Sequence, residues 1–378
     1  MCSSSLRVLT IAHNAVAASN RRRTEALRQI GADAHLLTPR WWYEEGRRIH
    51  VPRNAGWRVG RTLFTGNGTR HVYLTGLVNA VRTIQPDVID LYEEPFSLVA
   101  LQTLLAREVL APRAALVFYS AVNVMRDWRW PYRAIERVVL MRANGAHAPN
   151  HDVPSILRAK GFASDRPVHV IPLGVDVERF AVASPMDLAG IARPRVGFVG
   201  RLEPVKGLGL LTQAFGRLTT RASLVVAGYG SERRLLIGDR FHVLPPVAYD
   251  DLPAFLKSLD VLVLPSVTIL PLHREQFGRV LVEAMAAGVP VVGSSSGAIP
   301  EVVGDAGLVV PERDPAALAR AIDTVLSDAA LRQRLIERGR QRARMHFDWS
   351  IVATQTFELF HAAVAHRRGI TTMEAVGA

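Results

Sequence analysis

Residues 195–218 read RVGFVGRLEPVKGLGLLTQAFGRL, and this stretch decides the class of fold. The apolar run 195–199 has the length of one buried strand, and Gly200 ends it. A polar loop follows as far as Gly207, and residues 208–218 then carry apolar side chains at helical spacing. A strand, a loop and a helix in this order form the repeating unit of α/β proteins with parallel sheets.

The same alternation continues outward from this stretch in both directions. Toward the C-terminus we expect strands at 223–227, 242–244, 260–264, 290–292 and 308–310, with helices at 252–259, 279–287 and 315–326. Toward the N-terminus we expect strands at 6–12, 34–37, 48–51, 62–64, 71–74, 87–91, 115–119 and 168–172, with helices at 20–30, 76–83, 96–107 and 131–142. The sequence therefore predicts two Rossmann-like domains.

The boundary between the two halves is expected at residues 178–194, which lack a clear period and carry Pro185 and Pro194. This interpretation gives an N-terminal domain over 1–177, a linker over 178–194 and a C-terminal domain over 195–349. A helix over 350–365 is expected to pack back on the N-terminal domain, and residues 366–378 are expected to form a flexible tail.

Composition excludes several classes of protein. The chain has 378 residues, of which 49% are hydrophobic and 21% charged, as in folded globular proteins. Its single cysteine, Cys2, excludes an internal disulfide framework and a multi-cysteine zinc site. No apolar run reaches about 18 residues, and the run at 8–12 is too short for a signal peptide, so we expect a cytoplasmic protein.

The net charge of +12 suits anionic partners, although arginine-rich composition alone would also produce it. Apart from Arg21–Arg23 the basic residues are scattered, so we expect no nucleic-acid partner. Aromatic and basic residues alternate at 41–43 and 126–133, which suits either ordinary packing or peripheral contact with an anionic membrane on its inner face.

Two loops carry candidate chemistry. The loop Gly200–Gly207 presents Arg201 and Lys206 close to the start of a helix, where backbone N–H groups already favour an anion such as phosphate. The second segment holds Glu275 and Glu283, and Gly278 indicates that a helix begins between them. Free N–H groups at the start of this helix are suited to binding a second phosphate group, and the Glu283 carboxylate to accepting hydrogen bonds from a diol. Solvated surface charges would explain either loop as well.

These segments resemble motifs of the retaining glycosyltransferases of family 4, also called group 1, which have the GT-B fold. Gly200–Gly207 is similar to their G-R-x-x-x-x-K-G motif, and Glu275–Glu283 to their E-x7-E motif. Further similar segments are 171–176 (IPLGVD), 227–230 (AGYG), 286–292 (AAGVPVV), 294–307 and, in the N-terminal half, 92–97 (YEEPFS). The resemblance implies an α/β protein of two facing Rossmann-like domains with a cleft between them, the N-terminal one for the acceptor and the C-terminal one for the nucleotide-sugar donor.

The resemblance also implies roles for individual residues. Arg201 and Lys206 would hold the donor diphosphate, and Glu275 would contact the transferred sugar; these are the expected catalytic residues. The other residues expected at the donor are Gly200, Phe277, Gly278, Arg279, Val280 and Glu283, with His242 and Val243 beside the base. Candidates on the acceptor side of the N-terminal domain are His13, Asn14, Glu94 and Asn123.

Two departures from the family pattern limit the assignment. The loop after the first strand reads HNAVAAS over residues 13–19, where many relatives have two glycines. Residues 120–123 read SAVN where many relatives have a histidine, so no catalytic histidine is assigned, and His13 and His71 are weak substitutes.

The implied activity is transfer of a sugar from a nucleoside-diphosphate sugar to a hydroxyl acceptor, which is a glycan, a glycolipid or a small molecule, with a role in polysaccharide or glycolipid assembly. The chain contains no Asp-x-Asp pair, so we expect no metal and no other cofactor, with Arg201 and Lys206 supplying the positive charge. Two alternatives stay open: a sugar-nucleotide epimerase of the same fold, and a non-catalytic binder of sugar nucleotides or polyanions. An oxidoreductase is disfavoured because the nearest glycine string, 228–233, lacks a third glycine.

Overall fold

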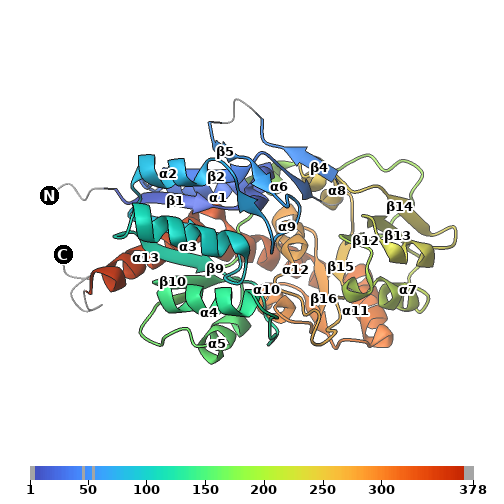
Figure 1. Ribbon diagram of the computed structural model, residues 1–378. Helices are drawn as coiled ribbons and strands as arrows, with labels where there is room; N and C mark the ends of the chain where they lie inside the picture. The colour runs from blue at the N-terminus through green and yellow to red at the C-terminus, as the bar shows by residue number, and fades with distance from the viewer. Residues whose placement is uncertain (1–4, 45–46, 53–55, 370–378) are drawn as a thin grey trace. The chain divides into compact units, whose positions relative to one another are not determined.

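The computed structural model describes residues 5–44, 47–52 and 56–369, which divide into two compact units (Figure 1). One unit joins the described residues up to Pro172 with those from Trp349 onward, and the other is Leu173–Asp348. Each is a parallel sheet with helices on both faces, as the alternating pattern predicts.

The first unit is built on a sheet of seven parallel strands in the order β11-β10-β9-β8-β1-β2-β5. Its strands are β1 (Arg7–Ile11), β2 (Asp33–Pro39), β5 (Arg58–Gly60), β8 (Val88–Leu91), β9 (Ala115–Tyr119), β10 (Gly145–Ala148) and β11 (Val168–Val170). Its helices are η1 (His13–Val16), α1 (Ala18–Gln29), α2 (Leu77–Ile84), α3 (Leu98–Leu110), α4 (Tyr132–Arg142), α5 (Asp152–Ala159) and α13 (Trp349–Arg368).

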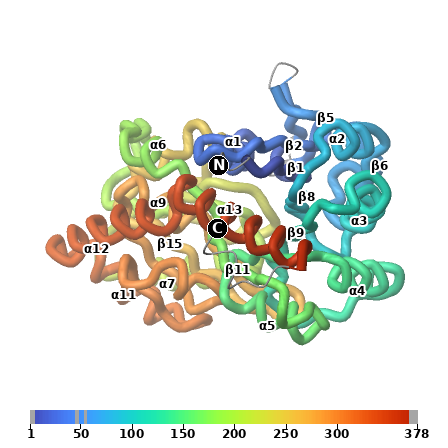
Figure 2. Tube along the Cα trace, turned by 90° about the vertical axis from the view of Figure 1, so that its left-hand side faces the viewer, coloured from blue at the N-terminus to red at the C-terminus, as the bar shows by residue number. Residues whose placement is uncertain are grey.

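Alternate residues of the inner strand β1 face the two sides of this sheet. Leu9 packs among the residues of α2, α3 and α4, whereas Val8 packs among those of α1 and α13. Since both faces are covered, the strands are apolar throughout rather than alternating, and continuous apolar runs therefore predict them in the sequence. Figure 2 shows α13 beside α1, where Phe360 is fully buried. The C-terminal helix thus completes the first unit.

Two small antiparallel hairpins lie beside the main sheet of the first unit. They pair β3 (Trp41–Glu44) with β4 (Arg47–His50), and β6 (Thr62–Leu63) with β7 (Val72–Tyr73). In the first hairpin Trp41 faces His50 and Trp42 faces Ile49. Because side chains alternate along a strand, Trp41 and Trp42 lie on opposite faces.

The second unit is a sheet of six parallel strands in the order β14-β13-β12-β15-β16-β17. Its strands are β12 (Arg195–Val199), β13 (Ser223–Ala227), β14 (Phe241–Leu244), β15 (Val261–Leu264), β16 (Val291–Ser294) and β17 (Leu308–Val310). Its helices are α6 (Val177–Val182), η2 (Pro204–Lys206), α7 (Leu208–Phe215), η3 (Ser231–Leu235), α8 (Leu252–Lys257), α9 (Arg279–Ala287), α10 (Ile299–Val303), α11 (Pro315–Ser327), α12 (Ala329–Arg342) and η4 (Ala343–Phe347).

The expected boundaries differ from those of the structure. Residues 178–194 are not a linker: they belong to the second unit, where Phe180 and Leu188 are buried in its core. The short helix α6 was not predicted, because its six residues are too few to show a clear helical period. The division after the first unit lies at Pro172 instead of residue 177. Helix α13 extends to Arg368, beyond the expected end at 365, and residues 370–378 of the expected tail lie outside the described residues.

Among the described residues, no helix has both the length and the apolar character that crossing a membrane requires.

Candidate functional site

The candidate donor site is centred on an ion pair between Lys206 and Glu275. Lys206 ends the short helix η2 after strand β12, and its Nζ lies 2.7 Å from Oε2 of Glu275. The hydroxyl of Ser266, just beyond strand β15, donates to the same oxygen at 2.6 Å. Loops that follow neighbouring parallel strands thus meet at one edge of the sheet, where α/β proteins bind ligands.

Burial would by itself raise the pKa of the Glu275 carboxyl, whose side chain is only 7% exposed. The charge of Lys206 and the hydrogen bonds from Lys206 and Ser266 overcome this effect and lower the pKa. Glu275 is therefore a buried, ionised carboxylate held beside a lysine. An ion pair of this kind is sensitive to the loss of either partner.

A glycine allows the loop to carry Lys206 this close to the sheet. Gly207 has φ 71°, and a Cβ at this position would lie 1.9 Å from the carbonyl oxygen of Pro265. No other residue fits that contact without moving the backbone. The same loop is fixed on its other side, since the N–H of Leu202 donates to the carbonyl of Tyr229 at 2.7 Å.

The expected partner of Lys206 in the same loop, Arg201, is placed differently. Its guanidinium pairs with Glu203 at 2.9 Å, and its side chain is 49% exposed. The structure therefore brings Lys206 and Glu275 together, while Arg201 and the neighbouring Gly200 lie in the loop without joining that pair. An exposed arginine can turn toward an arriving anion because long side chains change rotamer easily.

Helix α9 begins directly after Gly278, as the sequence predicts. Gly278 has φ 81° and no side chain with which to cap the first N–H groups. Phe277 is buried and meets the Phe347 ring edge-on at 5.8 Å between centroids, which fixes the chain at the helix start. Arg279 and Val280 form the first turn, so their N–H groups belong to the end of the helix that favours anions.

Glu283 lies one turn further along α9 and is buried rather than solvated. Burial, with the nearby charge of Glu283, raises the pKa of the Tyr249 hydroxyl to about 12. Tyr249 was not singled out in the sequence, since an isolated tyrosine carries no motif. His242 and Val243 lie within the edge strand β14, paired with Val225 and Val226, and both are partly exposed.

The first unit contains a second cluster, formed by His13, Glu93 and His71. The Nδ1 of His13 lies 2.6 Å from Oε2 of Glu93, and the backbone N–H of His13 donates to Oε1 at 2.7 Å. His71 is fully buried, with its Nε2 at 3.6 Å from Oε1 of the same carboxylate. His13 follows β1 and Glu93 follows β8, adjacent strands of the sheet, so these two also lie at its carboxyl edge, while His71 comes from the β6–β7 hairpin.

The charges in this cluster stabilise one another. Burial would raise the pKa of the Glu93 carboxyl, but His13 and His71 lower it. Burial would likewise lower the pKa of the His13 imidazole, but Glu93 raises it. The pair therefore resembles an imidazole held in place by a carboxylate, as in general acid–base sites.

The same three residues are a candidate metal site. Within the described part of the chain, His13, His71 and Glu93 are a group whose ligand atoms lie within 4.8 Å of one another. Zinc ligands in a tetrahedron lie roughly 3.3 Å apart, given bonds of about 2.0 Å. The 2.6 Å between His13 and Glu93 is shorter than that and fits a direct hydrogen bond.

A small cavity adjoins this cluster. It has a volume of about 130 Å³, and its lining includes His13, Asn14 and Trp42. The Trp42 ring lies 4.6 Å from the His13 ring and 5.0 Å from the His71 ring, between centroids. Trp42 and Glu93 were missed as site residues, although the strand before Glu93 is a strong signal that the following residues reach the ligand edge.

The remaining acceptor-side candidates lie in three segments, which follow strands β8, β9 and β1. Glu94 accepts hydrogen bonds from the Ser120 hydroxyl and the Ala121 N–H, both at 2.8 Å. Burial raises the pKa of the Glu94 carboxyl to about 7, since these hydrogen bonds offset burial only in part. Asn123 is buried in the loop after β9, and Asn14 follows His13 in η1.

The chain is similar in sequence to known proteins. Residues 191–342 match the family described as glycosyl transferases group 1. A D-inositol 3-phosphate glycosyltransferase of Salinispora tropica is 34% identical over 234 residues, covering 53% of this chain and 47% of that protein. The chain spans about half the length of the curated relatives it matches.

Solved structures resemble the whole chain. A sucrose-phosphate synthase from Thermosynechococcus elongatus has a TM-score of 0.68 and 20% identity, covering 95% of this chain and 99% of that one. HepE of Anabaena, solved with UDP and glucose, has a TM-score of 0.69 and 18% identity, covering 93% and 98%. At these identities the likeness shows a shared fold, and the expected GT-B fold is confirmed.

Proposed function

Because residues 191–342 match the family described as glycosyl transferases group 1, we propose that this protein transfers a sugar from a nucleoside-diphosphate sugar to a hydroxyl acceptor. The observation that carries the proposal is the buried ion pair of Lys206 and Glu275. It places a cation and an ordered carboxylate at the ligand edge of the sheet in the second unit, where the family match lies.

The proposed mechanism assigns each group a task. Lys206, with Arg201, neutralises the diphosphate as the bond from the sugar C1 to the phosphate oxygen breaks. The N–H groups at Phe277, Gly278 and Arg279 hold the phosphate. Glu275 orients the transferred sugar, and the buried Glu283 accepts hydrogen bonds from the ribose.

We propose that the configuration at C1 is retained and that no metal takes part. The acceptor oxygen attacks from the side of the departing diphosphate, and its proton passes to the leaving phosphate oxygen. Lys206 and Arg201 supply the charge that a metal ion would otherwise provide. The acceptor is assigned to the first unit, near His13 and Glu94. A cytoplasmic location, with peripheral contact at the membrane, completes the proposal.

UDP is the nucleotide to examine first, because the HepE structures hold UDP or UDP-glucose. The experiment is calorimetric titration of the protein with UDP, GDP and ADP in the presence of EDTA. We expect micromolar binding of one of them, and its loss in Lys206→Met.

A matched control is Lys160→Met in the first unit, which breaks a second lysine–glutamate pair, with Glu136, of the same 2.7 Å length. It should leave nucleotide binding unchanged. Binding of none of the three nucleotides, or equal loss in both variants, would contradict the proposed donor site.

A further inference from the structure

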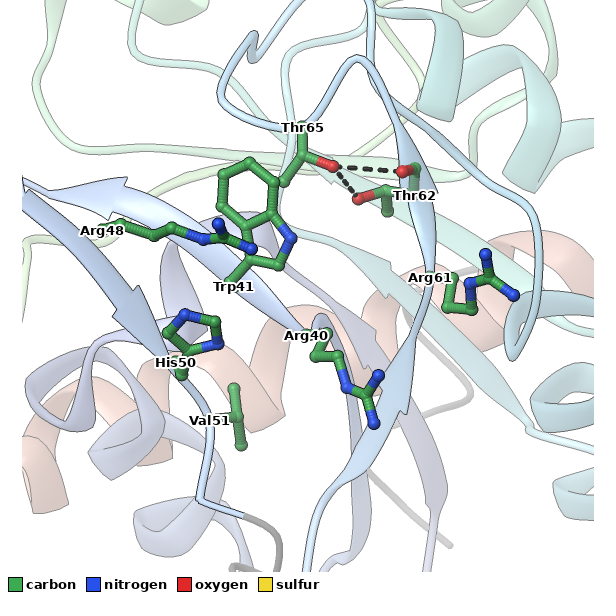
Figure 3. A pocket seen from close by; sticks show the side chains of 8 residues that line it. All are labelled: Arg40, Trp41, Arg48, His50, Val51, Arg61, Thr62 and Thr65. Carbon is green, nitrogen blue, oxygen red and sulfur yellow. Dashed lines mark hydrogen bonds between the residues drawn. The ribbon is translucent and has the colours of Figure 1, made fainter.

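Arginine side chains line a cavity beside Trp41, among the hairpins of the first unit (Figure 3). The cavity has a volume of about 580 Å³. Its lining consists of Arg40, Trp41, Arg48, His50, Val51, Arg61, Thr62 and Thr65. This lining contains three guanidinium groups and no carboxylate.

The backbone holds these basic residues in one place. Trp41 faces His50, and Tyr43 faces Arg48, across the β3–β4 hairpin, so Trp41, His50 and Arg48 share one face of it. The N–H of Arg40 donates to the carbonyl of Gly60 at 3.0 Å, which ties the start of the hairpin to the segment leading to Arg61.

Two contacts order the interior of the cavity. The Arg48 guanidinium lies 3.9 Å from the centre of the Trp41 ring, a stacking that limits its rotamers (Figure 3). The hydroxyls of Thr62 and Thr65 are 2.6 Å apart, which is one of the two contacts that the dashed lines mark. The Thr65 hydroxyl also donates to the Thr62 carbonyl at 3.1 Å, so these contacts hold both hydroxyls in place at the cavity wall.

The arginines of this cavity lack acidic neighbours. Within residues 5–44, 47–52 and 56–369, Arg40, Arg48 and Arg61 form no ion pair with a carboxylate. Other arginines of the unit differ: Arg23 pairs with Asp90, and Arg22 with Glu25. Three uncompensated guanidiniums around one space favour an anion of more than one charge.

We propose that this cavity binds a phosphate group carried by the acceptor, so that the substrate class is a phosphorylated polyol or a phosphate-bearing lipid headgroup. The proposal rests on the proposed function, since it names the acceptor of that transfer. The guanidinium fork matches phosphate oxygens, and the volume admits the phosphate together with a small polyol. Trp42, on the other face of the same hairpin, contacts His13, so one hairpin contributes to both the cavity and the His13 cluster.

The test is calorimetric titration of the full chain with glycerol 3-phosphate, with glycerol as the uncharged comparison. We expect binding of glycerol 3-phosphate alone, weakened by salt. In the double variant Arg48→Ala/Arg61→Ala its affinity should fall about tenfold or more. Arg113→Ala, which removes an exposed arginine outside the cavity, should leave the affinity within about twofold.

A second arm separates the two sources of phosphate. Vesicles of phosphatidylcholine, with or without phosphatidylglycerol, are sedimented with each variant. Loss of phosphatidylglycerol binding in the double variant, without binding of glycerol 3-phosphate, would assign the cavity to a lipid headgroup. Binding of both probes that is unchanged in the double variant, or binding of neither to the wild type, overturns the proposal.

UDP titration of the same samples keeps the two proposals distinguishable. The double variant should bind UDP as the wild type does, and thermal unfolding of the full chain shows whether its first unit is folded. If UDP binds and the phosphate probes do not, the proposed function stands and the phosphate site fails. If the phosphate probes bind and UDP does not, the phosphate site stands and the proposed function fails.

Discussion

Lys206 and Glu275 each hold the other in its charged form, so their substitutions should separate stability from activity. Lys206→Met leaves a buried carboxylate without its cation, which should cost about 3–5 kcal/mol of unfolding free energy. Glu275→Gln should cost less, because a neutral amide replaces the buried charge. Either change should lower kcat by roughly 100-fold or more, since each removes a preorganised group from the reacting centre.

The double variant Lys206→Met/Glu275→Gln is the control for this prediction. It should regain much of the stability lost in Lys206→Met while remaining as inactive as the single variants. Denaturant unfolding and turnover of the identified donor measure the two quantities. A double variant as unstable as Lys206→Met would show that the pair is not coupled as the 2.7 Å contact indicates.

Glu94 makes the stability of the first unit depend on pH. Its carboxyl has a pKa of about 7 in the fold against 4.5 ordinarily. Between these values the native chain keeps a proton that the unfolded chain has lost, so stability falls as pH rises through this window. The fall is on the order of 3 kcal/mol.

Glu94→Gln should abolish that contribution, because the amide resembles the protonated carboxyl and can still accept from the Ala121 N–H. Denaturant unfolding at pH 4.5 and pH 8 measures the difference between wild type and variant. Relative to the wild type, we expect the variant to have a higher free energy of unfolding at pH 8 than at pH 4.5. An equal difference at both pH values would show that Glu94 titrates normally.

At the scale of elements, the loop that carries Lys206 depends on a glycine. Gly207→Ala meets both a left-handed φ of 71° and the carbonyl of Pro265. Gly161→Ala, the matched control, has φ 94° but nothing within 4 Å of the added Cβ. The control should lose about 1–2 kcal/mol from backbone strain alone.

Gly207→Ala should lose more stability than the control and should also lose nucleotide binding, since relieving the clash moves Lys206. Thermal unfolding and UDP titration distinguish the two variants. Equal losses of stability, with binding retained in both, would mean that the loop adapts without displacing the lysine.

The elements that could be predicted from the sequence are those with a strong apolar period. The strand at 195–199 and the helix at 279–287 coincide with β12 and α9. Helices α6 and α12 were not predicted, because the first is only six residues long and the second is mostly polar and arginine-rich. The hairpin β3–β4 was expected only in its second strand, since its first strand is aromatic without clear alternation.

The candidate site was predictable where local sequence determines geometry. Gly278 and the start of α9 follow from a glycine before a helical period. The contact between Lys206 and Glu275 was implied by the family resemblance rather than by spacing, because the two residues are 69 positions apart. His13 and Glu93 meet through the strand order of the sheet, and His71 joins them from the separate β6–β7 hairpin; periodicity shows neither.

At the scale of the whole molecule, the chain leaves the first unit at Pro172 and returns to it at Trp349. Helix α13 then buries Leu359, Phe360 and Ala363 against the first sheet's α1 side. The first unit is therefore incomplete without the last helix, whereas Leu173–Asp348 is continuous and joins its own ends, since the Val175 N–H donates to the Phe347 carbonyl at 2.8 Å.

This arrangement predicts that residues 173–348 fold alone and bind the nucleotide, because Lys206, Glu275 and the start of α9 all lie within them. Residues 1–172 alone should fail to fold, since removing α13 exposes an apolar face of the size of a helix. Adding a peptide of residues 349–368 should restore cooperative unfolding. Thermal unfolding followed by circular dichroism and UDP titration measure both parts. A folded fragment 1–172 would show that the first unit does not need α13. A fragment 173–348 that folds but does not bind the nucleotide bound by the full chain would show that nucleotide binding needs the first unit.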